Sequence, residues 1–354
     1  MTRLIEILIS LAIVAVLFVA VALVLPSSRS LSESVETNRK MTIVYDTVNS
    51  LRRFKDWNPL VLRDPKVQLK LSGPDSGVGA RLDYVSEEPS LGEGSWEIVA
   101  SEPNKKVEYA LVNNERGTNK RTAFILEPTG RNNRNVKITQ TYDVDYGFNL
   151  LGRYNGLYVG SSIGDDLKLG LARMSNMLAS VPNYDYADFS RNDASMTPKV
   201  SDRPAENLLV VTAVVPRDNA KVQAQMQGNV EWIEKVIKAN GLQAVGPIRI
   251  VTNEFGAESY SFDVAQAVTK EGVTGAIDVN VEGPVEAKYV EASKIAVVPA
   301  KGHMAGLPVA RDSLRAWVLT RGYETVDRPY ELWKAGIPAG FTENGEYDVV
   351  WAIK

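Results

Sequence analysis

Cysteine and histidine, which supply most protein nucleophiles, general bases and zinc ligands, are nearly absent from this sequence. Among its 354 residues there is no cysteine and one histidine, His303. Without cysteine there can be no disulfide, thiolate nucleophile, zinc–thiolate site or iron–sulfur cluster. A serine–histidine–aspartate triad would have to be built around His303, whose glycine-rich surroundings are more typical of a turn. Chemistry that uses carboxylates alone is left open.

A pair of adjacent aspartates, Asp165 and Asp166, is the pattern that most suggests a metal ion. The pair lies in a stretch with helical periodicity, and neighbouring residues on a helix point in different directions. We therefore interpret both as solvated, and we expect neither a metal nor a cofactor. The formal net charge of −3 provides no basic field, so we expect no direct binding of nucleic acid.

The most apolar segment of the chain is residues 4–25. It carries one charge, Glu6, and its uncharged part, residues 7–25, is long enough to cross a bilayer core of about 30 Å. A cleaved signal peptide would have a shorter apolar region and a small-x-small cleavage site, which this segment lacks. We predict a single-pass anchor in the cytoplasmic membrane. Arg3 beside the short N-terminal tail favours a soluble part outside the cytoplasm, whereas Arg29, Arg39 and Lys40 on the other side of the segment favour the reverse orientation. We expect the soluble part outside the cytoplasm.

Two polar stretches divide the remainder of the chain. Residues 26–38 are rich in serine and are interpreted as a juxtamembrane spacer. Residues 183–206 combine aspartate, asparagine, serine and proline without an apolar period, which is typical of a linker. Two folded regions are therefore expected, at 39–182 and 207–354. The composition, with 44% hydrophobic and 23% charged residues, is ordinary for folded protein.

The first region combines strands with one long helix. A short strand is expected at residues 41–45. Segments with alternating hydrophobicity then recur at a spacing of roughly ten residues between glycine and proline turns, which predicts an antiparallel meander. From residue 156 to 181 the apolar residues change to steps of three and four, which predicts an amphipathic helix. The helix would cover the apolar face of the sheet.

The second region contains a weak internal repeat. Each half has a strand, a helix that ends at a glycine and two further strands. Gly241 and Gly322 occupy matching places after the two helices. The repeat predicts one α+β domain with pseudo-twofold symmetry.

The first region resembles the START-like family, also called SRPBCC or polyketide cyclase-like. The resemblance covers residues 39–182 and is carried by the sequence FKDWNPL at residues 54–60, by the glycines 77 and 79, and by the long final helix. It implies a helix-grip fold, in which an antiparallel sheet wraps around a C-terminal helix and encloses a cavity for a lipophilic molecule. Trp57 and Pro59 would then form a rigid corner at one end of that cavity.

The second region is similar to GyrI-like effector-binding domains of transcription activators. The segments GLQAVGPIRI and RGYETVDRPYELW carry this likeness, which covers residues 207–354. It implies a cleft between the two repeats that binds small cationic or lipophilic molecules, with a glutamate as the charged contact, and Glu331 stands at the matching position. An apolar segment and a START-like region stand where such regulators have a DNA-binding domain.

Candidate ligand contacts follow in both regions. In the second region, Glu331 among aromatic neighbours would favour a cation, because an unpaired buried carboxylate is costly and aromatic faces attract cations. Its expected companions are Tyr330, Trp333, Trp317, Tyr260, Tyr347 and His303. In the first region, apolar burial would supply most of the affinity. The expected lining residues are Trp57, Trp96, Tyr109, Phe124, Tyr142, Met174 and Leu178. Each of these aromatic and apolar residues could equally fill a solid core.

Three hypotheses for the function follow. The first is a membrane-anchored protein whose two modules bind a small hydrophobic or cationic ligand in order to sense it, sequester it or pass it on. The second is an enzyme, cyclase-like or hydrolase-like, that uses Glu331 as an acid or base. The third is a regulator that responds to a ligand and acts through a protein partner. The sequence identifies no such partner.

Overall fold

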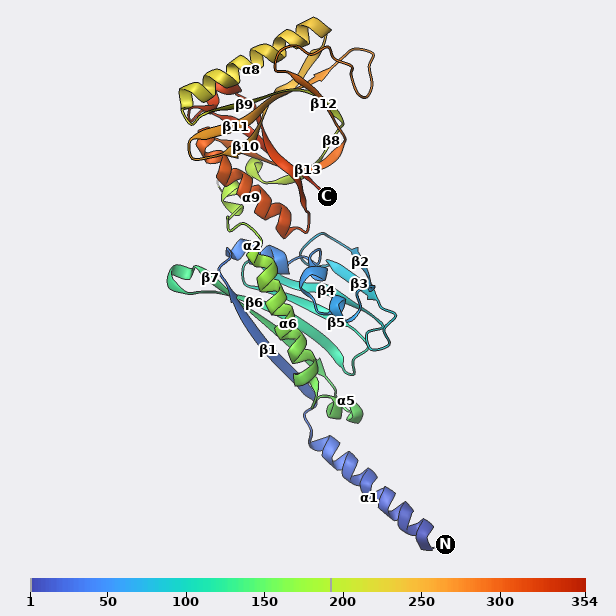
Figure 1. Ribbon diagram of the computed structural model, residues 1–354. Helices are drawn as coiled ribbons and strands as arrows, with labels where there is room; N and C mark the ends of the chain where they lie inside the picture. Colours follow the sequence, from blue (N-terminus) through green and yellow to red (C-terminus); the bar gives the residue numbers. More distant parts are fainter. Residues whose placement is uncertain (1, 192) are drawn as a thin grey trace. The chain divides into compact units, whose positions relative to one another are not determined.

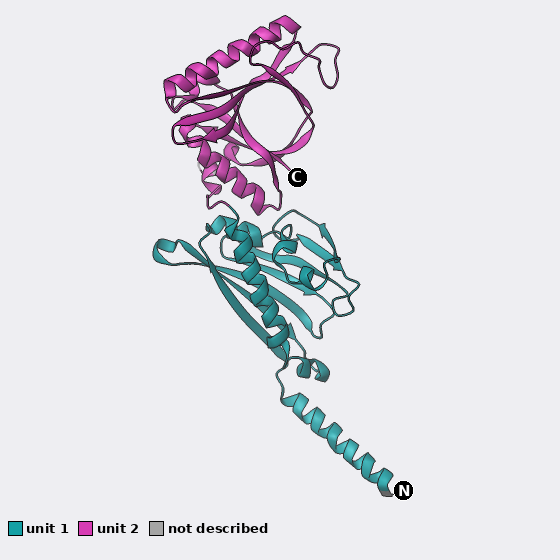
Figure 2. Ribbon diagram, viewed as in Figure 1, with its two compact units in different colours: residues 1–181 teal, residues 182–354 magenta. Residues whose placement is uncertain are grey.

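The computed structural model describes residues 2–191 and 193–354, and the chain divides into two compact units. Unit 1 spans residues 1–181 and unit 2 spans residues 182–354 (Figures 1 and 2). Both units are α+β, and each contains one antiparallel sheet, of seven strands in unit 1 and eight in unit 2. The expected fold class is therefore confirmed.

An apolar helix, α1 (Thr2–Val24), opens unit 1. Its segment Arg3–Val24 has a mean hydropathy of 3.3 and is long and apolar enough to cross a membrane, as an anchor or as a signal sequence. Almost all its described side chains are exposed, as expected for a helix whose apolar surface has no protein partner.

Unit 1 is built on a sheet with the strand order β1-β7-β6-β5-β4-β3-β2, which is a meander apart from β1. The helix α6 (Val159–Ala179) packs on the sheet with an apolar stripe that includes Leu167, Leu171 and Met174. The remaining elements are β1 (Ser28–Thr37), α2 (Met41–Val48), α3 (Phe54–Trp57), α4 (Leu60–Arg63), β2 (Gln68–Ser72), β3 (Arg81–Val85), β4 (Glu93–Glu102), β5 (Lys106–Val112), β6 (Thr118–Thr129), η1 (Arg131–Asn133), β7 (Asn135–Asp145) and α5 (Leu150–Asn155).

Two expectations for the start of unit 1 are wrong. The stretch 26–38 is not a spacer, because it contains β1, which pairs with β7 along ten residues from Ser28 to Thr37. Residues 41–45 are not a strand. They begin α2, which buries Ile43, Val44, Thr47 and Val48 at helical spacing. The fold of unit 1 therefore starts only a few residues after the apolar helix.

Unit 2 shows the predicted repeat in its topology. Its sheet has the order β12-β9-β11-β10-β14-β15-β13-β8, so that β9-β11-β10 and β14-β15-β13 are mirrored about the β10–β14 pair. The helix α8 belongs to the first half and α9 to the second. Gly241 ends α8 in the left-handed region, with φ of 61°, which glycine adopts without a steric cost.

The expected linker, residues 183–206, contains secondary structure that belongs to unit 2. Residues 183–206 hold the short helix α7, the turn η2 and the strand β8, which pairs with β13. The elements are α7 (Ala187–Ser190), η2 (Ala194–Met196), β8 (Lys199–Arg203), β9 (Glu206–Pro216), α8 (Asn219–Asn240), β10 (Gln243–Phe255), β11 (Ser259–Thr269), β12 (Glu286–Val290), β13 (Ser293–Lys301), η3 (Met304–Gly306), α9 (Leu307–Thr320), β14 (Thr325–Trp333), α10 (Gly336–Gly340) and β15 (Glu346–Ile353).

Candidate functional site

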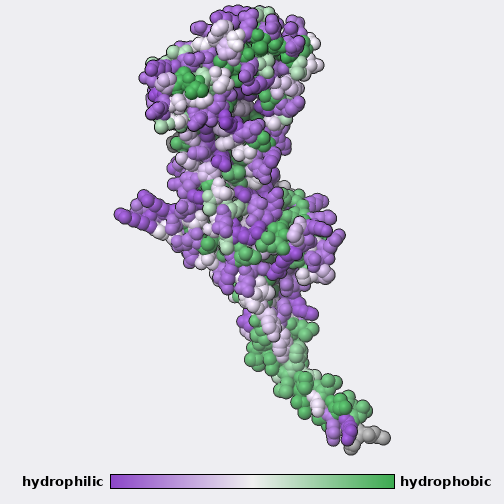
Figure 3. Space-filling model, viewed as in Figure 1, coloured by the Kyte–Doolittle hydropathy of each residue, from purple (hydrophilic) through white to green (hydrophobic). Residues whose placement is uncertain are grey.

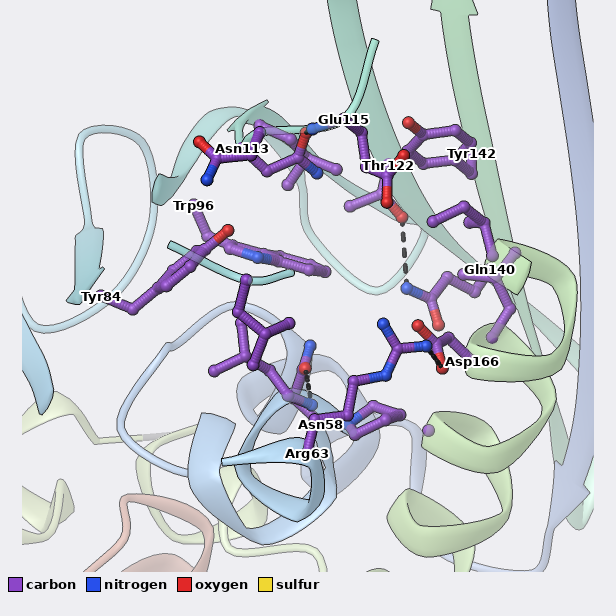
Figure 4. Close-up of a pocket in the computed structure, with 18 of the residues that line it drawn as sticks. Asn58, Arg63, Tyr84, Trp96, Asn113, Glu115, Thr122, Gln140, Tyr142 and Asp166 are labelled. Carbon is purple, nitrogen blue, oxygen red and sulfur yellow. Dashed lines mark hydrogen bonds and ion pairs between the residues drawn. The ribbon is translucent and has the colours of Figure 1, made fainter. Parts of the chain in front are cut away.

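Unit 1 contains a cavity of about 120 Å³ that is bordered by its sheet, by α6 and by the segment around α3 and α4. Figure 4 shows the rings of Tyr84 and Trp96 on one side of it, Gln140 and Asp166 on the opposite side, and Asn113 and Glu115 along the top of the view. The exposed lining residues mark its mouth: Ser90, Asn114 and Glu115 lie on turns between strands, and Arg63 lies at the end of α4. The volume is that of a few water molecules or a small part of a ligand.

An interlocked group of aromatic rings forms one wall of this cavity. Trp57 and Trp96 line it, and their ring centroids are 6.0 Å apart in an edge-to-face arrangement. Phe124 lies 5.5 Å from Trp57, and Tyr109 lies 5.6 Å from Trp96. Edge-to-face pairs add about 0.5–1.5 kcal/mol each beyond the burial of their area. The wall is therefore part of the core as well as a lining.

The opposite wall carries polar groups that are already paired with one another. Arg63 Nη2 lies 2.7 Å from Asp166 Oδ1, and Gln140 Nε2 donates to Thr122 Oγ1 at 3.2 Å (Figure 4). Burial raises the pKa of Asp166, and the Arg63 guanidinium opposes that effect. Asp166 is thus a partly buried member of the cavity wall, and the expectation that it would be a fully solvated helix residue is wrong.

Two tyrosine hydroxyls remain available in this cavity. Tyr84 and Tyr142 line it, and within the described part of the chain neither hydroxyl has a hydrogen-bond partner. Burial raises the pKa of both groups, so they stay neutral and can each donate one hydrogen bond. A ligand inside this cavity would meet an apolar wall and neutral donors, while the carboxylate of Glu115, which has no ion-pair partner among the described residues, lies at the mouth.

The predicted lining of unit 1 is present in part. Trp57, Trp96 and Tyr142 line the cavity. Tyr109 and Phe124 are completely buried and are not among its lining residues, and the Tyr109 hydroxyl donates to the carbonyl oxygen of Val48. Met174 and Leu178 are buried on α6 but are likewise core residues rather than lining residues.

Unit 2 contains a larger cleft of about 550 Å³. Its walls come from the start of α8, the β10–β11 hairpin and the segment from η3 into α9. The lining residues are Arg217, Asn219, Val222, Thr252, Phe255, Tyr260, His303, Met304, Ala305, Pro308 and Arg311. The volume falls within the range of typical small-molecule sites.

Glu331 lies behind this cleft rather than on its surface. Its side chain is completely buried, and the Nε of Arg311, which does line the cleft, donates to Glu331 Oε1. Arg311 Nη2 also donates to Thr252 Oγ1 at 2.8 Å. Burial raises the pKa of Glu331, and the Arg311 guanidinium opposes the shift. The Glu331 Oε2 atom has no hydrogen-bond partner among the described residues.

The aromatic surroundings expected for Glu331 form only in part. Tyr330 lies next to it on β14 and so faces the opposite side of the sheet, where its ring stacks against Arg249 at 4.0 Å. Trp333 shares the face of Glu331 and packs against Tyr347 at 5.3 Å. Trp317 is buried on α9. None of these four aromatic residues lines the cleft, so an aromatic cage around Glu331 that includes Tyr330 is not present.

Two predicted residues do reach the cleft, and the most informative ones were missed. Tyr260 and His303 line it, and the Nδ1 of His303 accepts a hydrogen bond from the amide of Ala305 at 3.1 Å. Arg217 and Arg311 were not predicted. Arg311 had a signal in the sequence, because it falls four residues after Leu307 and three before Leu314, on the apolar stripe of α9.

No grouping of three or more histidine, aspartate or glutamate side chains suited to a metal ion occurs in the described part of the chain. The two units are α+β, each with a helix-covered antiparallel sheet and with a hollow that could receive a small molecule.

Comparisons with known proteins give structural neighbours only. No protein-family model and no curated protein matches the sequence. Among solved structures, the EcmrR C-terminal domain is 18% identical, with 45% of this chain and 97% of that one covered and a TM-score of 0.36. Norcoclaurine synthase from Thalictrum flavum is 16% identical, with 43% and 87% covered and a TM-score of 0.34. Likenesses this distant establish neither a family nor a ligand.

Proposed function

We propose that the chain is a membrane-anchored protein that binds small lipophilic or amphipathic molecules in two separate modules. The observation that carries the proposal is that each unit has a hollow lined by apolar side chains with a few polar groups, behind an apolar helix long enough to cross a bilayer. Such sites bind by burial of apolar surface and need no catalytic residue. The protein would sense, sequester or pass on its ligand.

The test is native mass spectrometry of the full chain after release from its own membrane. The expected result is a protein mass that includes residues 2–25, together with additional masses of bound small molecules. A mass that lacks the apolar helix would contradict the anchor, because a signal peptide is removed. Protein that carries no small molecule, and that gains none when a library of lipophiles is added, would contradict the binding function.

Matched variants assign any bound mass to one hollow. Leu111→Trp places a large ring in the cavity of unit 1, and Ala305→Trp does the same in the cleft of unit 2. Each variant should lose the mass that belongs to its own unit and keep the other.

We also place the soluble part outside the cytoplasm. A cysteine introduced at the exposed Val78, in this cysteine-free chain, should then react in intact cells with a membrane-impermeant reagent.

A further inference from the structure

We infer that the cleft of unit 2 selects an anionic amphiphile, meaning a carboxylate, sulfonate or phosphate attached to an apolar body. The inference rests on the proposed function and names the ligand class for one of the two modules. It also reverses the charge that Glu331 would suggest if its carboxylate were accessible. Three features of the cleft wall lead to it.

The first feature is an arginine without an acidic partner. Arg217 lines the cleft, and Nη1 donates to the carbonyl oxygens of Gly256 at 3.0 Å and Ala257 at 3.3 Å. Its guanidinium carbon lies 4.0 Å from the ring centroid of Phe255. No carboxylate forms an ion pair with Arg217 in the described part of the chain. These contacts hold the guanidinium in place and leave its positive charge uncompensated.

The second feature is the arrangement of the Arg311–Glu331 pair. The guanidinium of Arg311 contributes to the cleft wall, whereas the carboxylate of Glu331 is completely buried behind it. A ligand therefore meets the positive member of the pair first. If Glu331 takes up a proton, the pair becomes net positive. In neither state does the pair present a negative charge to the cleft.

The third feature is the position of two helix starts. Asn219, the first residue of α8, and Pro308, the second residue of α9, both line the cleft. The N-terminal end of a helix carries a partial positive charge, which favours an anion. At the start of α8 the carboxylate of Asp218 accepts a hydrogen bond from the amide of Lys221 and offsets part of this positive charge, although Asp218 is not a lining residue. Among the described lining residues there is no aspartate or glutamate.

The apolar part of the ligand has its own surface. Val222, Phe255, Tyr260, Met304 and Pro308 supply aliphatic and aromatic groups to the same cleft. An acidic head group near Arg217 and an apolar tail against these residues would use both parts of the wall. A charge-assisted hydrogen bond to a guanidinium is stronger than one between neutral groups, and a bidentate contact adds geometric selectivity.

The experiment compares three probes that share one tail: octanoate, methyl octanoate and octyltrimethylammonium. Binding to the full chain in lipid nanodiscs is measured by calorimetry, with empty nanodiscs as the blank. Octanoate should bind about tenfold or more tightly than octyltrimethylammonium, which corresponds to one charge-assisted contact. Arg217→Gln should remove this preference. Lys238→Gln, which removes the same charge from the exposed last turn of α8, should keep it.

The outcomes separate the two levels of the proposal. Equal or tighter binding of the ammonium probe would overturn the anion assignment while leaving ligand binding intact. If none of the three probes binds the wild type more tightly than it binds Ala305→Trp, in which the cleft is filled, then no probe binds the cleft. That result would overturn the anion assignment and count against the proposed function of this unit. Glu331→Gln provides a further check. This variant removes a buried negative charge, so it should still bind octanoate.

A different observation points to a membrane-facing surface on unit 1. We infer that α5 and its flanking residues lie in the interfacial layer of the bilayer that α1 would cross. Arg153 Nη1 on α5 donates to the carbonyl oxygens of Ala22, Leu23 and Leu25, at 3.1–3.2 Å. Tyr154 stacks on Phe18 with ring centroids 4.5 Å apart. The end of α1 is therefore bound directly to α5.

The side chains around this contact are apolar and open to solvent. Phe148, Leu151, Leu157 and Tyr158 are between 50% and 88% exposed. Figure 3 shows apolar surface that continues from α1 onto the adjoining end of unit 1. Aromatic and aliphatic groups beside a spanning helix are typical of the membrane interface. A lipid bilayer is the partner that fits, because the same patch is continuous with the helix that would enter it.

This surface lies at the same end of the sheet as the mouth of the unit 1 cavity. Thr118 at the start of β6 pairs with Asp145 at the end of β7, just before Phe148. The turn that ends at Thr118 includes the mouth residues Asn114 and Glu115. A lipophile that leaves the bilayer at this surface would thus have a short path to the cavity.

A fluorescent label tests the surface. Phe148→Cys and Val78→Cys each introduce one cysteine into a cysteine-free chain, at exposed apolar positions at opposite ends of the sheet. Both are labelled with a nitrobenzoxadiazole dye in nanodiscs that contain brominated lipid. The label at position 148 should show blue-shifted and quenched emission, whereas the label at position 78 should not. Equal behaviour at the two positions would overturn the inference.

Discussion

The cavity of unit 1 and the cleft of unit 2 each have an arginine in the wall that pairs with a carboxylate, but the two carboxylates are placed differently. In unit 1 the side chains of Arg63 and Asp166 are 46% and 29% exposed, and both line the cavity. In unit 2 the side chain of Arg311 is 17% exposed and that of Glu331 is completely buried. The first pair presents both charges to a ligand, and the second presents only the positive one.

The comparison shows that burial, rather than the presence of a carboxylate, decides which charge a site displays. A half-exposed pair is screened by water and can exchange partners with a ligand at small cost. A buried carboxylate can give up its arginine only by taking up a proton or by accepting a large desolvation cost. We therefore expect neutral ligands in unit 1 and anionic ligands in unit 2.

The largest effect should come from the aromatic wall of unit 1. Trp57→Ala would leave a void among Phe54, Trp96 and Phe124, and we expect a loss of about 3–5 kcal/mol in the unfolding free energy of unit 1. Phe255→Ala in the cleft of unit 2 removes a ring that is 58% exposed and should cost about 1 kcal/mol or less. Urea unfolding followed separately for each unit measures both values, and equal losses would contradict the contrast between a core cavity and a surface cleft.

The two ion pairs give the next effect. At neutral pH, Arg311→Met should destabilise unit 2 by up to about 3–5 kcal/mol, because it leaves the buried Glu331 without its partner. Protonation of Glu331 limits this loss, so the effect should shrink as the pH falls. The matched change Arg63→Met should cost about 1 kcal/mol or less, because water can solvate Asp166. A larger loss for Arg63→Met would reverse the comparison.

Much of the fold could be predicted from the sequence, since period and turn chemistry are local properties. The helical stripe of α6 and the glycine that ends α8 were identified in this way. The strand β1 was missed because its residues are mostly serine and glutamate, even though their burial alternates and Leu31 and Val35 face inward. As an edge strand, β1 needs few apolar residues, so its composition resembles that of a linker.

The candidate sites could be predicted less well, because they depend on contacts between distant residues. Arg311 and Glu331 are 20 positions apart, and only the placement of α9 on the sheet brings them together. Tyr330 was expected beside Glu331, but the alternation of side chains along β14 places it on the opposite face. The family resemblance identified Glu331 as a candidate contact without revealing that Arg311 already pairs with it.

The smallest predicted effect concerns the proton on Glu331. Burial raises its pKa in the folded protein above the reference value of 4.5. Below that value the group is protonated in both the folded and unfolded states, so it adds no pH dependence. As the pH rises above 4.5, the unfolded chain releases this proton before the folded chain does. The unfolding free energy of unit 2 should therefore fall by at most about 1.4 kcal/mol per pH unit until Glu331 in the folded protein also ionises.

Glu331→Gln should lack this decline, whereas Glu286→Gln, which removes an exposed charge, should keep it. Apparent melting temperatures of unit 2 between pH 4 and pH 8 measure the difference. Identical profiles for the wild type and Glu331→Gln would mean that Arg311 compensates the carboxylate fully, which would make the two ion pairs more alike than their burial suggests.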